Sequence, residues 1–202
     1  MYTVVNKIIP PFKLNILQKA RWINFYLVFA MGKKKRRIKA MKEKRNNFVV
    51  FLDIDGVLNT RRTVESTPKG CVGIDDARVA ILANAIKKYG GGDIVLISDW
   101  KNLREDDKDY LYLLSKLYKE GFTLFGKTQD EMGQRGAGVW KYLQTHPEIE
   151  EYVILDDNAF DFRNYSKLWE RLLLTNGIEN AKFASHAPAV EALIFMDYLK
   201  QL

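Results

Sequence analysis

The stretch that decides the fold is "NNFVVFLDIDGVLNT", residues 46–60. Its apolar run over 49–52 is typical of a strand that is buried on both faces, and we expect this strand to cover 48–54. Asp53 and Asp55 lie at the end of the strand and are followed directly by a glycine. Because an ionised carboxylate resists leaving water unless a partner compensates its charge, this strand end indicates a functional site at the rim of a core.

Strand and helix patterns alternate along the rest of the chain. Short apolar runs predict further strands over 94–97, 122–125 and 152–155. Apolar residues at helical spacing predict helices that include 75–89, 111–118, 139–143, 165–173 and 188–201. Strands that alternate with helices in this way favour βαβ units. The expected fold class is therefore α/β, with a Rossmann-like, mostly parallel sheet and helices on both of its faces.

Polar side chains follow three of the predicted strands. Asp53 and Asp55 follow the first strand, Ser98 follows the second, and Asp156 and Asp157 follow the fourth. In open α/β sheets the functional groups gather beyond the carboxyl ends of the strands, so these side chains are expected to share one crevice. Carboxylates that share a crevice repel one another, and Mg²⁺, which favours oxygen ligands, would relieve the repulsion.

A magnesium ion beside a free carboxylate suits phosphoryl transfer, because the ion holds a phosphate oxygen while the carboxylate attacks phosphorus. Ser98 offers a hydrogen bond to another phosphate oxygen. The charge that develops in the reaction also needs a cation. Lys127, at the end of the third predicted strand, and Arg135, before the fourth, are the two candidates.

The order and spacing of these motifs carry a resemblance. "FLDIDGVLN", then "VLISDW", then a Lys or Arg, then "YVILDDNAFD" resembles the haloacid dehalogenase (HAD) superfamily of phosphohydrolases, over about residues 47–200. More narrowly, "DIDGVLN", "ISDWK" and "GKT…RG…WKYL…YVILDD" resemble the HAD domains of multidomain RNA repair proteins.

The resemblance implies a role for each matching residue. Asp53 matches the nucleophile that forms an aspartyl-phosphate. Asp55 matches the general acid/base, and its main-chain carbonyl is usually a metal ligand in the family. Ser98 matches the phosphate-binding residue of the second motif.

The fourth motif supplies the remaining implied metal ligands. Asp157 matches the acidic metal ligand, with Asp156 in support, so that Asp53, Asp55, Asp156 and Asp157 together form the expected Mg²⁺ site. Asp161, four residues after Asp157, matches a variant position that holds an outer-shell water. For the third motif, Arg135 is slightly preferred over Lys127, because the family often places its cation at the start of that helix.

Charge is distributed unevenly along the chain. Residues 1–47 contain 13 Lys and Arg against one acidic residue, whereas the remaining 155 residues contain 19 against 24. A basic extension over 1–46 is therefore expected to precede a HAD-like hydrolase domain over 47–202. Three interpretations of the extension stand: an arm that binds RNA or a membrane surface, a weakly ordered leader without a role, or a segment outside the natural protein, since Met31 and Met41 are plausible starts.

The compartment follows from two further observations. Cys71 is the single cysteine, so no disulfide forms within the chain and a reducing, cytoplasmic location is expected. The longest apolar run near the N-terminus, "WINFYLVFAMG", has about half the length of a membrane-spanning helix, so no integral membrane span is predicted.

The expected function is that of a Mg²⁺-dependent phosphatase without a cap domain. The segment 59–74 is long enough for a small flap but not for a folded domain. Arg61, Arg62 and Lys69 in this flap are candidate cationic contacts, although solvated loop charges are an equal alternative. An open site favours a phosphate on a large partner, a polynucleotide or a phosphoprotein. Two alternatives remain: a phosphatase of polynucleotide ends in nucleic-acid repair, and a non-catalytic binding module whose basic tail contacts RNA or anionic lipid.

Overall fold

The computed structural model describes residues 47–130 and 133–201. These residues belong to one compact unit that runs from Arg45 to Leu202. The extension predicted over 1–46 lies outside the described residues. Within the part of the chain that is described, no helix has both the length and the apolar character needed to cross a membrane.

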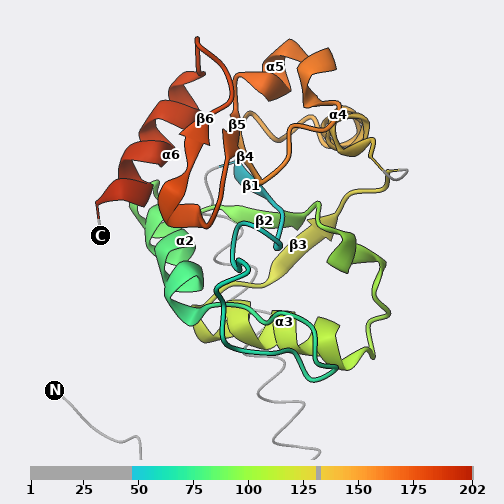
Figure 1. Ribbon diagram of the computed structural model, residues 1–202. Helices are drawn as coiled ribbons and strands as arrows, with labels where there is room; N and C mark the ends of the chain where they lie inside the picture. The colour runs from blue at the N-terminus through green and yellow to red at the C-terminus, as the bar shows by residue number, and fades with distance from the viewer. Residues whose placement is uncertain (1–46, 131–132, 202) are drawn as a thin grey trace, which may run out of the picture. The chain divides into compact units, whose positions relative to one another are not determined.

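A six-stranded sheet forms the centre of the unit, in the order β3-β2-β1-β4-β5-β6 (Figure 1). The strands are β1 (Phe48–Leu52), β2 (Asp93–Leu96), β3 (Leu124–Lys127), β4 (Glu151–Asp156), β5 (Leu172–Leu174) and β6 (Lys182–Phe183). All neighbouring strands are parallel except β6, which runs antiparallel to β5. The prediction of a mostly parallel α/β sheet is confirmed.

Helices cover both faces of this sheet, and β1 shows why its sequence is apolar throughout. Phe48, Val50 and Leu52 point into one core, which includes side chains of α2 (Asp76–Lys88), α3 (Lys108–Lys119) and α6 (Val190–Lys200). Val49 and Phe51 point into a second core with α4 (Arg135–Thr145) and α5 (Ser166–Trp169). Because successive side chains of a strand alternate between faces, a strand covered on both sides needs apolar residues at every position.

Three sequence-based boundaries were wrong. The first strand was expected over 48–54, but β1 ends at Leu52. The third strand was expected over 122–125, but β3 covers Leu124–Lys127. The helix expected over 165–173 ends at Trp169, and the apolar residues after it form β5. A run of three leucines fits either element by periodicity alone, and its pairing with β4 decides in favour of the strand.

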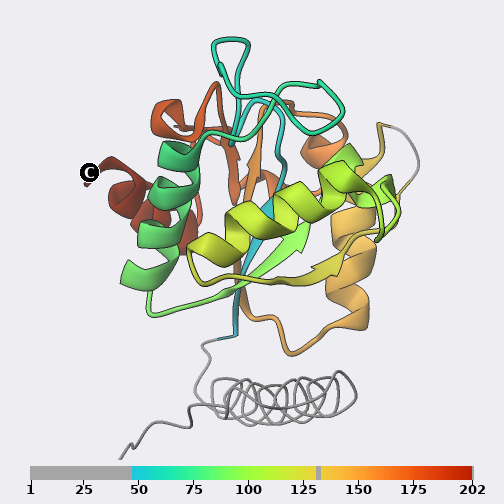
Figure 2. The same cartoon turned by 90° about the horizontal axis from the view of Figure 1, so that it is seen from below.

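The segment between β1 and α2 forms a flap beyond the carboxyl ends of the strands (Figure 2). An isolated bridge between Ser66 and Val72 closes its outer loop. The hydroxyl of Tyr112, from α3, accepts a hydrogen bond from the Ile74 backbone at 2.9 Å and donates one to Glu65. Apart from this flap, the described chain between β1 and β3 carries only α2, β2, the 3₁₀ turn η1 (Asp99–Asn102) and α3, so no cap domain is inserted there.

Candidate active site

Parallel pairing brings the polar strand ends together at one edge of the sheet. Asp53 follows β1 directly, and its backbone N–H donates to the carbonyl of Leu155 in β4 at 2.9 Å. The Ile97 N–H donates to the carbonyl of Leu52 at 3.0 Å, which places Ser98 beside Asp53. Ser98 lies close enough to the Asp53 carboxylate to oppose the rise of its pKa, and both side chains are buried.

Arg135, the first residue of α4, supplies the cation of this buried group. Its Nη1 lies 2.9 Å from Asp53 Oδ1 and 2.8 Å from Asp156 Oδ2. The guanidinium also stacks on the ring of Phe160, with Cζ 4.5 Å from the ring centroid. One cation thus faces two carboxylates, so the group retains uncompensated negative charge.

The Asp53 carboxylate carries the clearest sign of a missing partner. Arg135 Nη1 lies near Asp53 Oδ1, but this contact does not have the geometry of a hydrogen bond. No described residue donates a hydrogen bond to this buried oxygen. Burial raises the pKa of Asp53, and the neighbouring carboxylate of Asp156 raises it further. Burial raises the pKa of Asp156 as well. A divalent cation would remove the cause of both shifts by making the ionised forms favourable.

Three carboxylates lie close enough to share such a cation. Asp53, Asp156 and Asp157 each offer an oxygen within 4.8 Å of the others. Both oxygens of Asp156 are already engaged, because Oδ2 accepts from Arg135 and Oδ1 accepts from the Asn158 N–H at 2.9 Å. The most available oxygens are therefore those of Asp53 and Asp157, and an all-oxygen set fits Mg²⁺.

Gly56 creates the space that Asp157 occupies. A Cβ atom at Gly56 would lie 2.4 Å from the Cβ and Oδ2 atoms of Asp157, and its φ of +76° is one that other residues rarely adopt. The Gly56 carbonyl accepts hydrogen bonds from the Thr175 hydroxyl at 2.7 Å and the Gly177 N–H at 2.8 Å. The loop after β5 thus holds the turn that follows Asp55.

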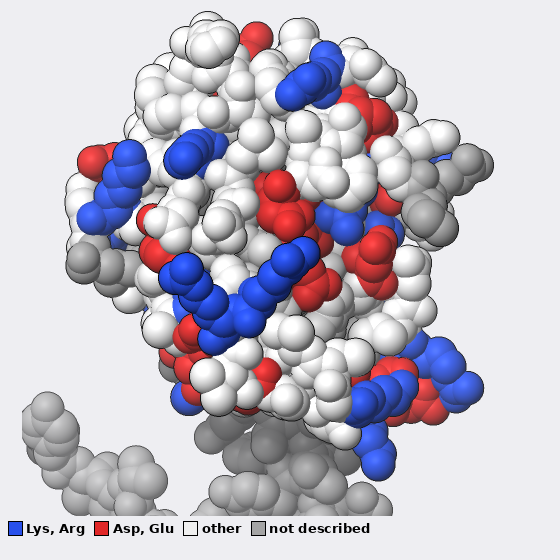
Figure 3. Space-filling model, in the orientation of Figure 1, with Lys and Arg blue, Asp and Glu red and all other residues white. Residues whose placement is uncertain are grey.

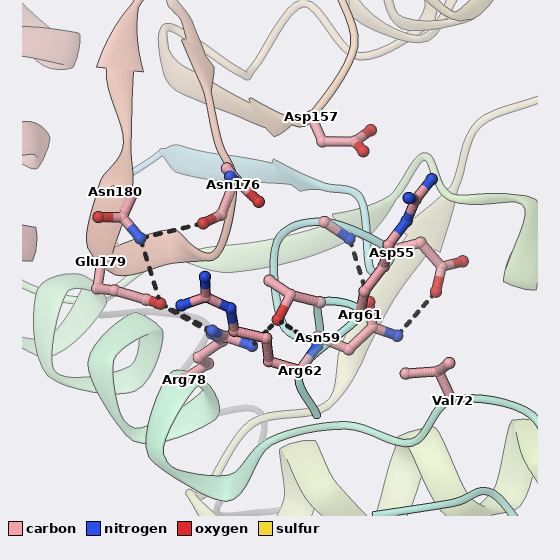
Figure 4. Close-up of a pocket in the computed structure, with 12 residues that line it drawn as sticks. Asp55, Asn59, Arg61, Arg62, Val72, Arg78, Asp157, Asn176, Glu179 and Asn180 are labelled. Carbon is pink, nitrogen blue, oxygen red and sulfur yellow. Dashed lines mark hydrogen bonds and ion pairs between the residues drawn. The ribbon is translucent and has the colours of Figure 1, made fainter. Parts of the chain in front are cut away.

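Asp55 is exposed, and its carboxylate lies outside the group of three carboxylates that are close enough to share a cation. Its Oδ1 accepts a hydrogen bond from Asn59 Nδ2 at 2.8 Å, and its Oδ2 accepts one from Trp100 Nε1 at 3.0 Å. Asn59 Oδ1 in turn accepts from the Gly56 N–H at 3.1 Å, as Figure 4 shows. These two donors hold the Asp55 carboxylate at the mouth of the site.

Lys127 and Asp161 have other contacts. Lys127 Nζ lies 4.0 Å above the ring of Tyr110 and 3.4 Å from the Lys101 carbonyl, and it makes no described contact with Asp53. Asp161 accepts hydrogen bonds from the Gly136 N–H at 2.6 Å and the Ala137 N–H at 2.9 Å. These bonds attach Asp161 to the first turn of α4, which begins with Arg135. Its outer-shell role stays a prediction.

Three further residues organise the site through contacts that sequence reasoning did not assign to them. Asn59 and Trp100 hold Asp55, as described above. Lys101 is buried, with Nζ 2.8 Å from the Ile97 carbonyl and 3.0 Å from Asp130 Oδ1, so it fixes the end of β2 next to Ser98. The only sequence signal was their position, within four residues of Asp55 or Ser98.

A cavity of about 580 Å³ adjoins the exposed side of the site (Figure 4). Asp55, Gly56 and Asp157 form the wall nearest the buried carboxylates. The other lining residues are Asn59, Thr60, Arg61, Arg62, Val72, Arg78, Asn176, Glu179 and Asn180. On this face of the molecule, acidic side chains gather at the centre, with cationic side chains beside them (Figure 3).

Residues 49–179 match the family described as "HAD domain in Swiss Army Knife RNA repair proteins". The chain belongs to this family. The matched region spans well over half of the sequence and includes every polar strand end of the site, from Asp53 to Asp157. No curated protein and no solved structure gives a significant match to the chain. The family places this HAD domain among phosphohydrolase-type folds, in agreement with the acidic cluster at the strand ends.

Proposed function

We propose that this HAD domain is a Mg²⁺-dependent phosphohydrolase that acts through an aspartyl-phosphate on Asp53. The observation that carries the proposal is the buried Asp53 oxygen without a hydrogen-bond donor, beside Ser98, Arg135 and a second acidic residue with a free oxygen, Asp157. A purely structural carboxylate at this depth would be satisfied by donors, since an unpaired buried oxygen is costly.

The chemistry assigns one bond change to each carboxylate. An Asp53 oxygen forms a bond to the phosphorus of a phosphate monoester, and the bond from phosphorus to the ester oxygen breaks. Asp55 gives its proton to that leaving oxygen. In the second half of the reaction, Asp55 takes a proton from water, and the water oxygen attacks the phosphorus. The bond between phosphorus and the Asp53 oxygen then breaks, so phosphate leaves and the Asp53 carboxylate is restored.

The other residues bind and orient the phosphoryl group. Ser98 donates to a phosphate oxygen, and Arg135 offers positive charge where negative charge develops. Mg²⁺ held by Asp53 and Asp157, with Asp156 behind them, would supply the further positive charge that draws a phosphate dianion to this acidic crevice. Asn59 and Trp100 each donate a hydrogen bond to one oxygen of Asp55, and these two bonds fix the orientation of its carboxyl group.

The substrate we propose is a phosphate at the end of a polynucleotide, handled in the cytoplasm. Two observations support this choice. The described chain inserts no cap domain over the crevice, so a large substrate has access to Asp53. The family description places the domain in RNA repair proteins. A phosphorylated protein side chain is the competing outcome that the same experiment measures.

The test compares kcat/KM for several substrates in the presence of Mg²⁺. They are p-nitrophenyl phosphate, 5′- and 3′-phosphorylated oligonucleotides, a phosphopeptide and sugar phosphates. We expect hydrolysis that EDTA stops and that an oligonucleotide end supports best. A small metabolite that wins by tenfold, about 1.4 kcal/mol of transition-state discrimination, would contradict the open-site argument. Absence of hydrolysis for every substrate would instead favour a non-catalytic binding module.

A further inference from the structure

The cavity beside Asp55 and Asp157 has a cationic side that the proposed chemistry does not use. Arg61 and Arg62 line it, both are exposed, and neither guanidinium makes a hydrogen bond or ion pair with a described residue. In Figure 4 the Arg61 side chain rises towards Asp55 and Asp157, and Arg62 extends towards Glu179. Two guanidinium groups without partners at the edge of an acidic site are available to an anionic ligand.

A third arginine in the same cavity shows the contrast. Arg78 Nη2 lies 2.7 Å from Glu179 Oε1, and its Nε donates to Glu179 Oε2 at 2.9 Å. Its Nη1 donates to the hydroxyls of Thr60 and Thr63, at 3.3 and 3.2 Å. Arg78 is therefore a structural residue, and the turn between the two threonines is attached to α2.

The turn that carries Arg61 and Arg62 is fixed from within as well. The Thr63 N–H donates to the Thr60 carbonyl at 2.9 Å, and the Thr60 N–H donates to the Thr63 hydroxyl at 3.0 Å. The Arg62 N–H donates to the Thr60 hydroxyl at 3.2 Å. A turn with this many bonds presents its two arginines from a defined position, which lowers the entropy cost of binding.

We propose that Arg61 and Arg62 form a second phosphate subsite, which binds the internucleotide phosphate next to the reacting terminal phosphate. This inference rests on the proposed function, because it assumes that the terminal phosphate occupies the crevice at Asp53. The cavity between the two sites has room for the connecting nucleoside, and Asn176 and Asn180 on its far wall offer amide groups to a sugar or base. The minimal good substrate is then a dinucleotide.

The alternative is that the two arginines only offset the net acidity of the folded part of the chain. A general charge effect would act on every anionic substrate in the same way, whereas a subsite acts only on a substrate with a second phosphate. The ratio of kcat/KM for a terminally phosphorylated dinucleotide to kcat/KM for the matching mononucleotide separates the two cases.

The experiment measures this ratio for the full chain with Mg²⁺, for the double variant Arg61→Gln/Arg62→Gln and for the control Arg104→Gln/Arg163→Gln. Arg104 and Arg163 are exposed arginines outside the cavity, and their joint substitution also removes two positive charges, so it is the matched control for lost charge. We expect the double variant to lower the ratio by about tenfold or more, as lost charge-assisted phosphate contacts would. The control should keep the wild-type ratio.

A binding measurement makes the result independent of turnover. The Asp53→Asn variant, with and without the two arginine substitutions, is titrated with the same dinucleotide and mononucleotide. If the dinucleotide binds only when both arginines are present, but the wild type does not hydrolyse it, the proposed function is refuted. The phosphate subsite is then still supported. Hydrolysis with an unchanged ratio in the double variant, or an equal loss for both substrates, would overturn the subsite and keep the phosphatase.

Discussion

At the scale of single residues, Asp53 combines two demands that conflict in the absence of a metal. Asp53 is buried beside Ser98 and Arg135, and the nucleophilic role proposed for it requires that it be ionised beside Asp156. Burial of a carboxylate near a like charge costs stability, so the site itself is a source of instability in the metal-free protein.

The substitution Asp53→Asn separates catalysis from stability. We expect it to lower turnover by at least about 10³-fold, because it removes the nucleophile. It should also raise the melting temperature in EDTA, since Arg135 keeps its ion pair with Asp156 and the repulsion between carboxylates disappears. Circular dichroism melts and p-nitrophenyl phosphate assays measure both effects. Near wild-type turnover in the purified variant would show that another residue is the nucleophile.

The raised pKa of Asp53 predicts a pH dependence of metal-free stability. The folded pKa lies above the usual 3.8, so the folded state binds the proton more tightly than the unfolded state does. The stability that Asp53 contributes to the folded state is therefore fully present below about pH 4, and it is lost as the pH rises through the raised pKa of Asp53. In EDTA, the melting temperature of the wild type relative to that of Asp53→Asn should fall over this range. At the highest pH of this range, Mg²⁺ should raise the melting temperature of the wild type more than that of the Asp53→Asn variant.

Gly56 and Gly70 allow a controlled test of the space beside Asp157. Both have a positive φ, of +76° and +88°, but only Gly56 faces a neighbour, since nothing lies within 4 Å of a Cβ at Gly70. Alanine should cost about 1 kcal/mol or more of stability at either position through backbone strain. Only Gly56→Ala should also lose most phosphatase activity and the thermal shift produced by Mg²⁺. Equal activity of the two variants would argue against a metal-binding role for Asp157.

The order of the motifs in the sequence was enough to predict which residues meet at the ends of the parallel strands. Asp53, Ser98 and Asp156 lie together because each ends a strand of a parallel sheet. By contrast, the sequence supported only a slight preference for Arg135 over Lys127, since one begins and the other ends an element that approaches the site. Which side chain reaches Asp53 depends on the rotation of α4 and on the ring of Tyr110, and neither is encoded locally.

At the scale of secondary-structure elements, α4 begins with its functional residue, so its N-terminus must be held in place. Asp161 does this from outside the helix, by accepting hydrogen bonds from the Gly136 and Ala137 N–H groups. A carboxylate at a helix N-terminus also interacts favourably with the helix dipole. The position of Arg135 therefore depends on Asp161, which lies 26 residues later in the chain.

Asp161→Ala should lower stability by about 1 kcal/mol and reduce kcat, because it frees the start of α4. Asp75→Ala is the matched control, since Asp75 caps α2 by accepting from the Ala77 N–H at 2.9 Å. The control should lose similar stability while its kcat stays near the wild-type value. Urea denaturation and steady-state kinetics give both quantities. An equal effect on kcat in the two variants would mean that Asp161 only stabilises the fold.

Helix and strand positions followed from periodicity wherever a segment was long. The expected helix over 75–89 agrees with α2 at Asp76–Lys88 to within one residue at each end. The errors lie in short segments, in β3 and in the leucines of β5. There, pairing with a neighbouring strand decides the outcome, and the neighbour is distant in sequence.

At the scale of the whole molecule, the sheet begins with Phe48 in β1, within a compact unit that runs from Arg45 to Leu202. A chain that starts at Met41 should therefore fold and retain its phosphatase activity. Soluble yield, the melting temperature and kcat/KM for p-nitrophenyl phosphate, measured beside the full chain, test this. Insoluble material would show that residues before Met41 belong to the folded domain. Unchanged p-nitrophenyl phosphate turnover with weaker oligonucleotide turnover would favour an RNA-binding role for the basic segment.

The position of β1 inside the sheet gives it two pairing partners that are distant in sequence. Val50 pairs with Ile94 on one side and with Val153 on the other. One edge of β1 therefore pairs with β4, a strand that lies about a hundred residues later in the chain. Closing so long a loop is slow, and the transition state for folding is reached before every late contact has formed. Asp53 and Asp156 approach each other only when β4 docks on β1. Magnesium that binds the finished site should accordingly slow unfolding far more than it speeds folding, so that the ion lengthens the lifetime of the native state.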